Sequence, residues 1–308
     1  MNENKRAILK KHGYSFTGEE SGVKLCKWVG EKLTGNDACY KEKFYGIESH
    51  RCLQMSPVID TCNLSCLFCW RYQDHDTDND IEFDDPEHIV QQSLDAQKDL
   101  VSGYGGESRV SNNLWKEAQN PKHVAISLAG EPTLYPYLSE LIREYNKKGM
   151  TTFLVTNGTR PKVLENLDTL PTQLYITIAA PNKKVYEKLC IPKSKKSWER
   201  LNDSLELLDS LDTRTVVRHT LVNNWNIGWE DEYAKLLQTA NPDYIEAKGY
   251  VFVGDSRRRM SLDNMPSHKK VKGFARKISK FLNLEMLDEK KRSRVALLGK
   301  NDSKRKID

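Results

Sequence analysis

The chain has 308 residues and a formal net charge of +5, with 38% hydrophobic and 30% charged residues. This composition supplies enough apolar side chains for a large core and excludes an intrinsically disordered chain. The sequence has no run of about 18 apolar residues, which excludes a membrane-spanning helix. The start, from Met1 to Arg6, is polar and has no apolar stretch behind it. We therefore expect no signal peptide and a cytoplasmic protein.

Six apolar, β-rich runs follow one another along the chain, at residues 52–59, 123–128, 151–156, 174–179, 215–222 and 244–253. Most of them are separated by stretches with apolar residues at every third or fourth position, such as 137–148 and 198–211, which predict helices. Alternation of buried strands with helices indicates a parallel sheet. In parallel barrels the chemistry gathers at the C-terminal ends of the strands.

The C-terminal part is basic, with 17 basic and 6 acidic residues from Arg257 onward. This gives that part a net charge of +11 and the rest of the chain −6, a distribution typical of a protein that contacts a polyanion. Between Arg257 and Arg294 the basic residues interleave with apolar ones, which predicts an amphipathic helix. Its apolar residues are Phe274, Ile278, Phe281, Leu284 and Leu287. For Lys300 to Asp308 we expect a solvated tail.

Six of the seven cysteines lie between residues 26 and 69, and the odd total argues against a disulfide framework and for metal or redox chemistry. The tightest group is Cys62, Cys66 and Cys69. Zinc sites usually repeat a C-x2-C pair to supply four ligands. Three thiolates on a short loop are better suited to a 4Fe-4S cluster with one open iron, and zinc is the alternative. The remaining Cys190 is expected to be a buried core thiol.

The Cys62-x3-Cys66-x2-Cys69 motif, with Phe68 before the last cysteine, resembles the signature of radical S-adenosylmethionine (SAM) enzymes. The resemblance implies that the open iron binds SAM through its amino and carboxylate groups. It also implies reductive cleavage of SAM to a 5′-deoxyadenosyl radical. The fold it implies is α/β, a partial (β/α)6 TIM-like barrel, which the six predicted strands match. Phe68 is expected either near the adenine or in the core.

Turns after three of the predicted strands resemble further motifs of that family. The sequence 128–132 resembles its Gly-Gly-Glu motif, in which Glu131 would be the partner of the SAM ammonium. Ala129 replaces the first glycine, which weakens the backbone contact usually assigned there. Each turn alone would be ordinary, and their order behind the cysteine loop is what supports the assignment. The SAM contacts that the resemblance implies are Gly130, Glu131, Thr156, Asn157 and Thr177.

A second triplet, Cys26, Cys39 and Cys52, precedes the first and suggests a second 4Fe-4S cluster with an open iron. Together with the residues around Cys39, Cys52 and Trp70, this pattern resembles the archaeal 4-demethylwyosine synthases of the tRNA wybutosine pathway. The resemblance spans about residues 20–290. It implies a SAM-dependent carbon–carbon lyase that condenses N1-methylguanosine, next to the anticodon of tRNA-Phe, with pyruvate.

The same resemblance implies that pyruvate binds at the second cluster. A desolvated lysine there could form a Schiff base with its keto group, and we expect Lys41, with Lys43 as the alternative. The target base must leave the anticodon loop, with Trp70, Tyr72, Trp225 and Trp229 as candidate stacking partners. Candidate phosphate contacts are 257–259, 269–270 and 290–292. We expect a monomer that uses an external ferredoxin or flavodoxin as electron donor.

The expected organisation is an extension over 1–44 that carries part of the second Fe-S site, a barrel over 45–283 and a basic tail over 284–308. The acidic stretch 74–80 resembles a calcium loop but lacks the required Gly and Glu, so it is predicted to be a solvated loop. Two rival interpretations are a glycyl-radical-activating enzyme and a non-catalytic, zinc-stabilised RNA-binding protein.

Overall fold

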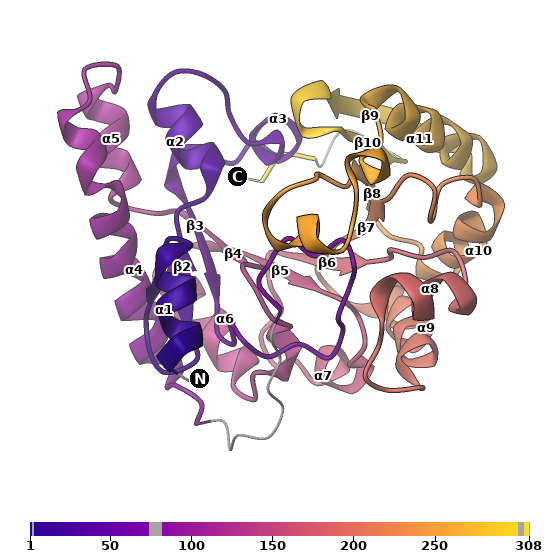
Figure 1. The fold of residues 1–308 in the computed structure, drawn as a ribbon, viewed down its shortest axis with the longest axis horizontal. Coiled ribbons are helices and arrows are strands. Elements are labelled where there is room, and N and C mark those ends of the chain that lie inside the picture. Colours follow the sequence, from indigo (N-terminus) through magenta and orange to yellow (C-terminus); the bar gives the residue numbers. More distant parts are fainter. Residues whose placement is uncertain (2, 74–81, 301–304, 308) are drawn as a thin grey trace.

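The computed structural model describes residues 1, 3–73, 82–300 and 305–307. Within them a single ten-stranded sheet has the order β1-β2-β3-β4-β5-β6-β7-β8-β10-β9. Its six central strands, β3 to β8, pair in parallel, each with the next along the chain. They are Cys52–Ser56, His123–Ile126, Thr151–Thr156, Gln173–Thr177, Arg214–Leu221 and Tyr244–Gly249. These are the six predicted strands, and the expected partial (β/α)6 barrel is confirmed as an open, curved sheet (Figure 1).

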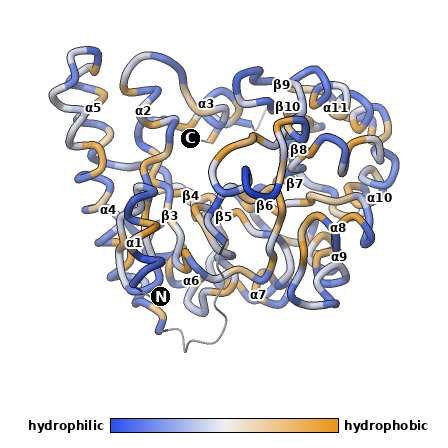
Figure 2. The backbone as a smooth tube through the Cα atoms, in the orientation of Figure 1, coloured by the Kyte–Doolittle hydropathy of each residue, from blue (hydrophilic) through white to orange (hydrophobic). Residues whose placement is uncertain are grey.

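The helices that cover the outer face of the sheet connect the parallel strands, except for α11, which lies between β8 and β9 (Figure 1). They include α4 (Pro86–Ser102), α6 (Leu138–Lys147), α8 (Lys183–Cys190), α9 (Ser197–Leu207), α10 (Glu230–Ala240) and α11 (His268–Leu282), with the short α5 (Asn112–Ala118) and α7 (Pro161–Glu165). Two of them match the helices predicted at 137–148 and 198–211. Figure 2 shows the apolar residues gathered along the strands and the inward sides of these helices.

Successive residues of a strand point to opposite faces of the sheet. One set of alternate residues belongs to the main apolar core beneath the helices: Leu53, Val124, Leu154, Ile176, Val217 and Ile245. The other set faces the inside of the barrel and includes Phe153 and Tyr175, which pack with α3 (Tyr40–Tyr45). The N-terminal extension, with α1 (Glu3–Lys11), α2 (Lys27–Leu33) and α3, thus brings Cys39 and Lys41 to the inner face.

Antiparallel hairpins extend the sheet at both edges. Strands β1 (Tyr14–Phe16) and β2 (Gly22–Lys24) continue it beyond β3. Strands β9 (Glu285–Lys290) and β10 (Val295–Gly299) continue it beyond β8. Each hairpin covers an edge that would otherwise present unpaired backbone groups.

The second hairpin corrects two expectations. The amphipathic helix expected between Arg257 and Arg294 is confined to α11, because Asn283 takes a left-handed conformation (φ 50°) that ends the helix and sends the chain into β9. The basic tail expected over 284–308 is not a tail at residues 285–299, since all five residues of β10 are buried. Nor are residues 305–307 free, because the Ile307 N–H donates to the Tyr45 carbonyl.

No helix in the described part of the chain is long and apolar enough to cross a bilayer. The acidic stretch 74–80, which we expected to be a solvated loop, lies outside the described residues.

Removing side-chain volume from β10 tests whether the C-terminal hairpin belongs to the core. Leu297 is fully buried against the cluster that contains α3. Leu297→Ala should lower the free energy of unfolding by about 2–5 kcal/mol, the usual cost of such a cavity. Urea denaturation of the full chain measures this, with the exposed Lys291→Ala as control. Unchanged stability of Leu297→Ala would restore the tail interpretation.

Candidate active site

The loop after β3 carries Cys62, Cys66 and Cys69, and its first half is fixed by the end of α8. The Ser65 N–H donates to the Cys190 carbonyl at 3.1 Å, and the Leu67 N–H donates to the Leu189 carbonyl at 2.9 Å. Leu64 also forms a β-bridge with Pro192. The loop is thus held by backbone groups about 120 positions away in the chain, as the numbering shows.

The second half of this loop is held by the segment after β8, which lies beside it in Figure 1. Arg259 donates to the carbonyls of Leu67 and Cys69, and its guanidinium is paired with Asp255 at 2.8 Å. A Cβ on Gly254, which has φ +60°, would come within 2.4 Å of the Trp70 carbonyl, so only glycine fits there. Arg259 was expected to contact phosphate, and the structure instead commits it to the cysteine loop.

The environment of the cysteines fits metal ligation. Four thiols accept a backbone N–H from the residue two positions later: Cys26 from Trp28, Cys39 from Lys41, Cys62 from Leu64 and Cys69 from Arg71. Burial raises the pKa of each of these four thiols, that of Cys39 to about 11. Without a metal they are therefore protonated at neutral pH, and metal binding releases those protons. Hydrogen bonds to sulfur of this kind also tune iron–sulfur clusters.

Cys190 is buried, as expected, but it also contacts the first triplet. A hydrogen bond between the Cys66 and Cys190 thiols, followed by burial, raises the pKa of Cys66. A metal bound by Cys66 would replace this thiol–thiol contact.

Glu131 lies just after β4 and is 2% exposed. Its carboxylate accepts hydrogen bonds from the hydroxyls of Thr133 and Thr156 at 2.6 and 2.5 Å and from the Asn157 N–H at 2.8 Å. In the described residues no Lys, Arg or His forms an ion pair with it, and burial raises the pKa of this carboxyl. A buried carboxylate without a cation beside the cysteine loop fits the ammonium group of SAM.

The other expected SAM contacts are distributed around Glu131. A Cβ on Gly130, at φ +67°, would lie 1.9 Å from the Val58 carbonyl, so this glycine permits the close approach of the cysteine loop. The Asn157 amide donates to Asn63 in that loop at 2.8 Å. Thr177 ends β6 on the inner face, and Phe68 is partly buried against an apolar cluster around Tyr250. The sequence analysis missed Asn63, because nothing in the sequence indicates its hydrogen bond with Asn157.

The second triplet comes together at the inner face of the barrel. Cys26 and Cys39 immediately precede α2 and α3, and Cys52 is the first residue of β3. After burial, the nearby Cys26 thiol is the next influence that raises the pKa of both Cys39 and Cys52. Residues spaced by 13 positions in the sequence therefore form one group of thiols in space.

Lys41 points from α3 into this region and is 8% exposed. Its Nζ lies 4.5 Å from the ring centre of Phe153 and 4.6 Å from that of Tyr175. Burial and then the charge of Arg218 lower the pKa of Lys41. Lys43, the alternative, is half exposed and paired with Asp288 at 2.6 Å on the outside. The structure thus brings Lys41, and not Lys43, to the second triplet.

A buried ion pair lies beside Lys41. Glu246 on β8 accepts hydrogen bonds from the hydroxyls of Tyr40 and Tyr45 and from Arg218 Nε, at 3.0, 2.8 and 2.9 Å. Although burial opposes it, Arg218 and then Lys41 hold the pKa of Glu246 below its usual value.

Lys248 joins this group from two positions further along β8. Burial and then Arg218 lower the pKa of Lys248 to about 8. The sequence analysis missed Arg218, Glu246 and Lys248. One sequence feature could have revealed them: charged residues stand at alternate positions of strands that are otherwise apolar. Such residues are expected to be buried, and buried charges often mark functional sites.

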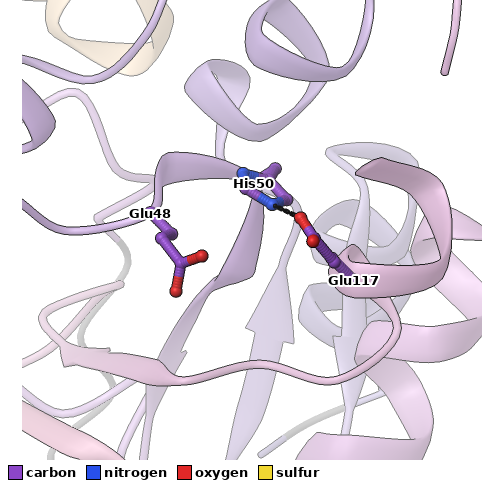
Figure 3. Close-up of side chains that lie close together, drawn as sticks. All are labelled: Glu48, His50 and Glu117. Atoms are coloured by element: carbon purple, nitrogen blue, oxygen red, sulfur yellow. Dashed lines mark hydrogen bonds and ion pairs between the residues drawn. The ribbon is translucent and has the colours of Figure 1, made fainter. Parts of the chain in front are cut away.

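Glu48, His50 and Glu117 bring three potential ligand atoms within 4.8 Å of one another (Figure 3). The Glu48 carboxylate is already paired with Lys122 at 2.9 Å, and His50 Nε2 lies 2.7 Å from Glu117. These pairs account for the group without a metal. They connect the turn before Cys52 to α5 and to the start of β4.

The candidate RNA contacts differ in exposure. Trp70 and Trp229 are each 41% exposed, whereas Trp225 and Tyr72 are partly buried. Arg257, Arg258, Lys269 and Lys270 are exposed. Lys290 and Arg292 pair with Asp37 of the N-terminal extension at 2.6 and 3.3 Å. The exposed residues are thus available for RNA, while Lys290 and Arg292 hold the extension to the C-terminal hairpin.

Comparison with known proteins agrees with this geometry. A family model of the radical SAM superfamily matches residues 56–237, and one for wyosine base formation matches residues 239–300. A tRNA 4-demethylwyosine synthase of Pyrococcus abyssi, named as S-adenosyl-L-methionine-dependent, is 47% identical over 308 residues, covering 98% of this chain and 90% of that protein. The chain belongs to the family of radical SAM tRNA 4-demethylwyosine synthases.

Solved structures of this family superpose on the whole chain. One, described as TYW1 with a lysine-pyruvate adduct bound, has a TM-score of 0.90 at 37% identity and covers 100% of this chain and 98% of that chain. The crystal structure of an archaeal TYW1 has a TM-score of 0.83 at 34% identity and covers 100% of both chains. Membership in this family implies SAM and a 4Fe-4S cluster, and it rules out the two rival interpretations.

Two glycines with similar backbone angles test the geometry at Glu131. Gly130→Ala should lower SAM affinity at least about tenfold, because its Cβ meets the Val58 carbonyl and displaces the residue that would hold the SAM ammonium. Gly149→Ala has the same strain, at φ +71°, but nothing within 4 Å of its Cβ, so SAM affinity should stay unchanged. Equilibrium dialysis of SAM against both reconstituted variants measures this. Equal affinity in Gly130→Ala and the unmodified chain would contradict the assignment.

Proposed function

We propose that this chain condenses N1-methylguanosine of tRNA-Phe with pyruvate to form 4-demethylwyosine, and that Lys41 forms a Schiff base with the pyruvate. The observation that carries the proposal is the position of Lys41, buried at the inner face beside the second cysteine triplet. A lysine must lose its proton before it can attack a carbonyl, and burial beside Arg218 favours the neutral amine. A relative with a lysine-pyruvate adduct supports the same chemistry.

Formation of the Schiff base at Lys41 needs only the neutral lysine and pyruvate, and it releases water. Nζ attacks the keto carbon of pyruvate, the carbonyl oxygen leaves as water, and a C=N bond replaces the C=O bond. Glu246 remains paired with Arg218 and hydrogen-bonded to two tyrosine hydroxyls, so it holds the neighbouring charges in place during the step.

The charges around Lys41 favour an anionic substrate. Arg218, Lys41 and Lys248 share one buried carboxylate, that of Glu246. We propose that Lys248 holds the pyruvate carboxylate, because its Nζ contacts only a carbonyl, that of Ser293 at 3.3 Å, among the hydrogen bonds of the described residues. A charge-assisted hydrogen bond of this kind fixes the keto carbon relative to Lys41.

We further propose that Cys26, Cys39 and Cys52 bind a second 4Fe-4S cluster near Lys41. At the proposed SAM site, the Glu131 carboxylate would hold the SAM ammonium. Thr156 and Asn157 would keep the Glu131 carboxylate in place through their hydrogen bonds to it. When bound, SAM and the cluster at Cys62, Cys66 and Cys69 supply the one-electron chemistry that removes a hydrogen atom from the N-methyl group. Each cysteine triplet leaves one iron open for a small ligand.

We propose that the RNA approaches over the cysteine loop and the segment after β8. Trp70 offers an exposed indole, and Arg257 and Arg258 offer exposed guanidinium groups on the neighbouring turn. The electron donor would be an external ferredoxin or flavodoxin, and the chain would act as a monomer.

Reductive trapping tests the Schiff base directly. With pyruvate and cyanoborohydride, the chain should gain the mass of one reduced pyruvate unit at residue 41, located by peptide mass spectrometry. Lys41→Ala should lose the adduct and product formation. Lys43→Ala should retain both, because Lys43 lies outside the site. An adduct at Lys248 or an unmodified rate in Lys41→Ala would refute the assignment of Lys41.

Iron content tests the second cluster. Anaerobic reconstitution should give about eight irons per chain, two cubanes with three cysteines each. Replacing Cys26, Cys39 and Cys52 with alanine should leave about four irons and uncoupled SAM cleavage, but no 4-demethylwyosine in digested tRNA. About four irons in the unmodified chain would refute the second cluster.

A further inference from the structure

Arg71 ends the loop that carries the first cysteine triplet, and it is buried at 7% exposure. Its Nη1 donates to the Tyr14 hydroxyl at 3.0 Å, and its guanidinium carbon lies 3.2 Å from the centre of the Trp70 ring. Tyr14 belongs to β1, which pairs with β2 immediately before Cys26. The hydrogen bond and the stacking therefore fix the guanidinium between the cysteine loop and the edge hairpin.

Arg71 differs from Arg218 and Arg259, two partly buried arginines, because it has no carboxylate partner among the described residues. Arg218 is paired with Glu246 at 2.9 Å, and Arg259 with Asp255 at 2.8 Å. Among the described residues, no Asp or Glu lies within 4.0 Å of the Arg71 guanidinium, and Tyr14 is its hydrogen-bond acceptor. A buried guanidinium without a negative partner is costly, so an anion is expected beside it in the complete enzyme.

Arg71 also lies close in the chain to a cysteine of the first triplet, since it follows Cys69 by two residues. The backbone N–H of Arg71 donates to the Cys69 thiol. The acceptor Tyr14 lies opposite Lys24 in the β1–β2 pairing, and Lys24 stands two residues before Cys26. The guanidinium therefore lies between the loop that ends at Cys69 and the segment that leads to Cys26. Among the described residues, its hydrogen-bond acceptor and its stacking partner are both neutral.

We propose that Arg71 is a positioning residue whose charge is shared by the two iron–sulfur clusters and raises the reduction potential of both. The proposal rests on the second cluster of the proposed function. Reduction adds one electron, and hence one negative charge, to a centre whose thiolate ligands are already anionic. A fixed cation in a buried site stabilises this reduced form more than the oxidised form. The same residue would therefore ease electron uptake at both centres.

Redox titration with dithionite, followed by EPR, tests this in the reconstituted full chain. Arg71→Met should lower the reduced-to-oxidised ratio of each cluster about tenfold at a fixed potential, which is a shift of about 59 mV for a one-electron couple. Addition of SAM identifies the first cluster, since SAM binds to its open iron. Arg71→Lys, which keeps the charge, should restore most of both shifts.

Arg143→Met is the matched control, because it removes one positive charge from an exposed position on α6 and should leave both potentials unchanged. If Arg71→Met does not fold or take up iron, Arg71→Gln removes the same charge and keeps a polar side chain. Unshifted potentials in a loaded, uncharged variant would overturn the proposal, and so would a shift in one cluster only. An equal shift in Arg71→Lys would also overturn it, since geometry and not charge would be responsible.

The two proposals fail in different ways. With about eight irons bound and unshifted potentials, only the role of Arg71 fails. With about four irons in the unmodified chain, the second cluster fails, and the shared role of Arg71 fails with it.

Discussion

The ion pair between Arg218 and Glu246 is the interaction on which the inside of this barrel depends. It connects β7 to β8, and through the Tyr40 and Tyr45 hydroxyls it connects both strands to α3. Breaking a buried pair of this kind by removing one partner costs about 3–5 kcal/mol, because the other charge is left uncompensated. Since α3 carries Lys41 and follows Cys39, the position of the lysine proposed to bind pyruvate, and of one thiol, depends on a carboxylate about 200 residues away.

The loop that carries Cys62, Cys66 and Cys69 is also positioned by residues that are distant in the chain. It has no strand or helix of its own, and its geometry comes from the end of α8 on one side and from Arg259 on the other. Gly130 and Gly254 let backbone segments approach it where any side chain would collide. A loop held from several distant elements is rigid without regular structure, which suits ligands that must keep fixed distances to a cluster.

The sequence was sufficient for the parts of the fold that have a local pattern. The six strands and the helices at 138–147 and 197–207 follow from apolar periodicity. The first cysteine motif could be recognised because its three cysteines lie within one short segment of the sequence. The C-terminal hairpin was not predictable in the same way, because the apolar residues after α11 continue its pattern. Only Asn283 and Leu284 separate the helix from β9, and Asn283 has the left-handed conformation that ends the helix. Asparagine can adopt this conformation but also occurs within helices, so its presence does not predict the end of the helix.

Contacts made between distant segments account for the rest of what was missed. Arg259 is one of three consecutive arginines, and nothing local shows that it alone turns inward to the carbonyls of Leu67 and Cys69. Arg218 and Glu246 become partners only because their strands pair in register. Lys248 then joins them because alternate residues of β8 share one face. Residue types and spacing thus predicted the thiols and one lysine, but the charges that surround them required the sheet.

Strand β3 connects Cys52 of the second triplet to the loop of the first triplet in the chain. Cys52 is its first residue, and the loop that carries the first triplet follows its last residue. Arg71 is a buried cation at the end of that loop, and no Asp or Glu among the described residues is paired with it. This charge costs free energy in the unloaded chain and would be compensated by an anionic cluster bound at the cysteines. Binding of a cluster at the cysteine loop would therefore stabilise the fold at the residues that hold the cluster, and assembly of the site would be part of folding itself.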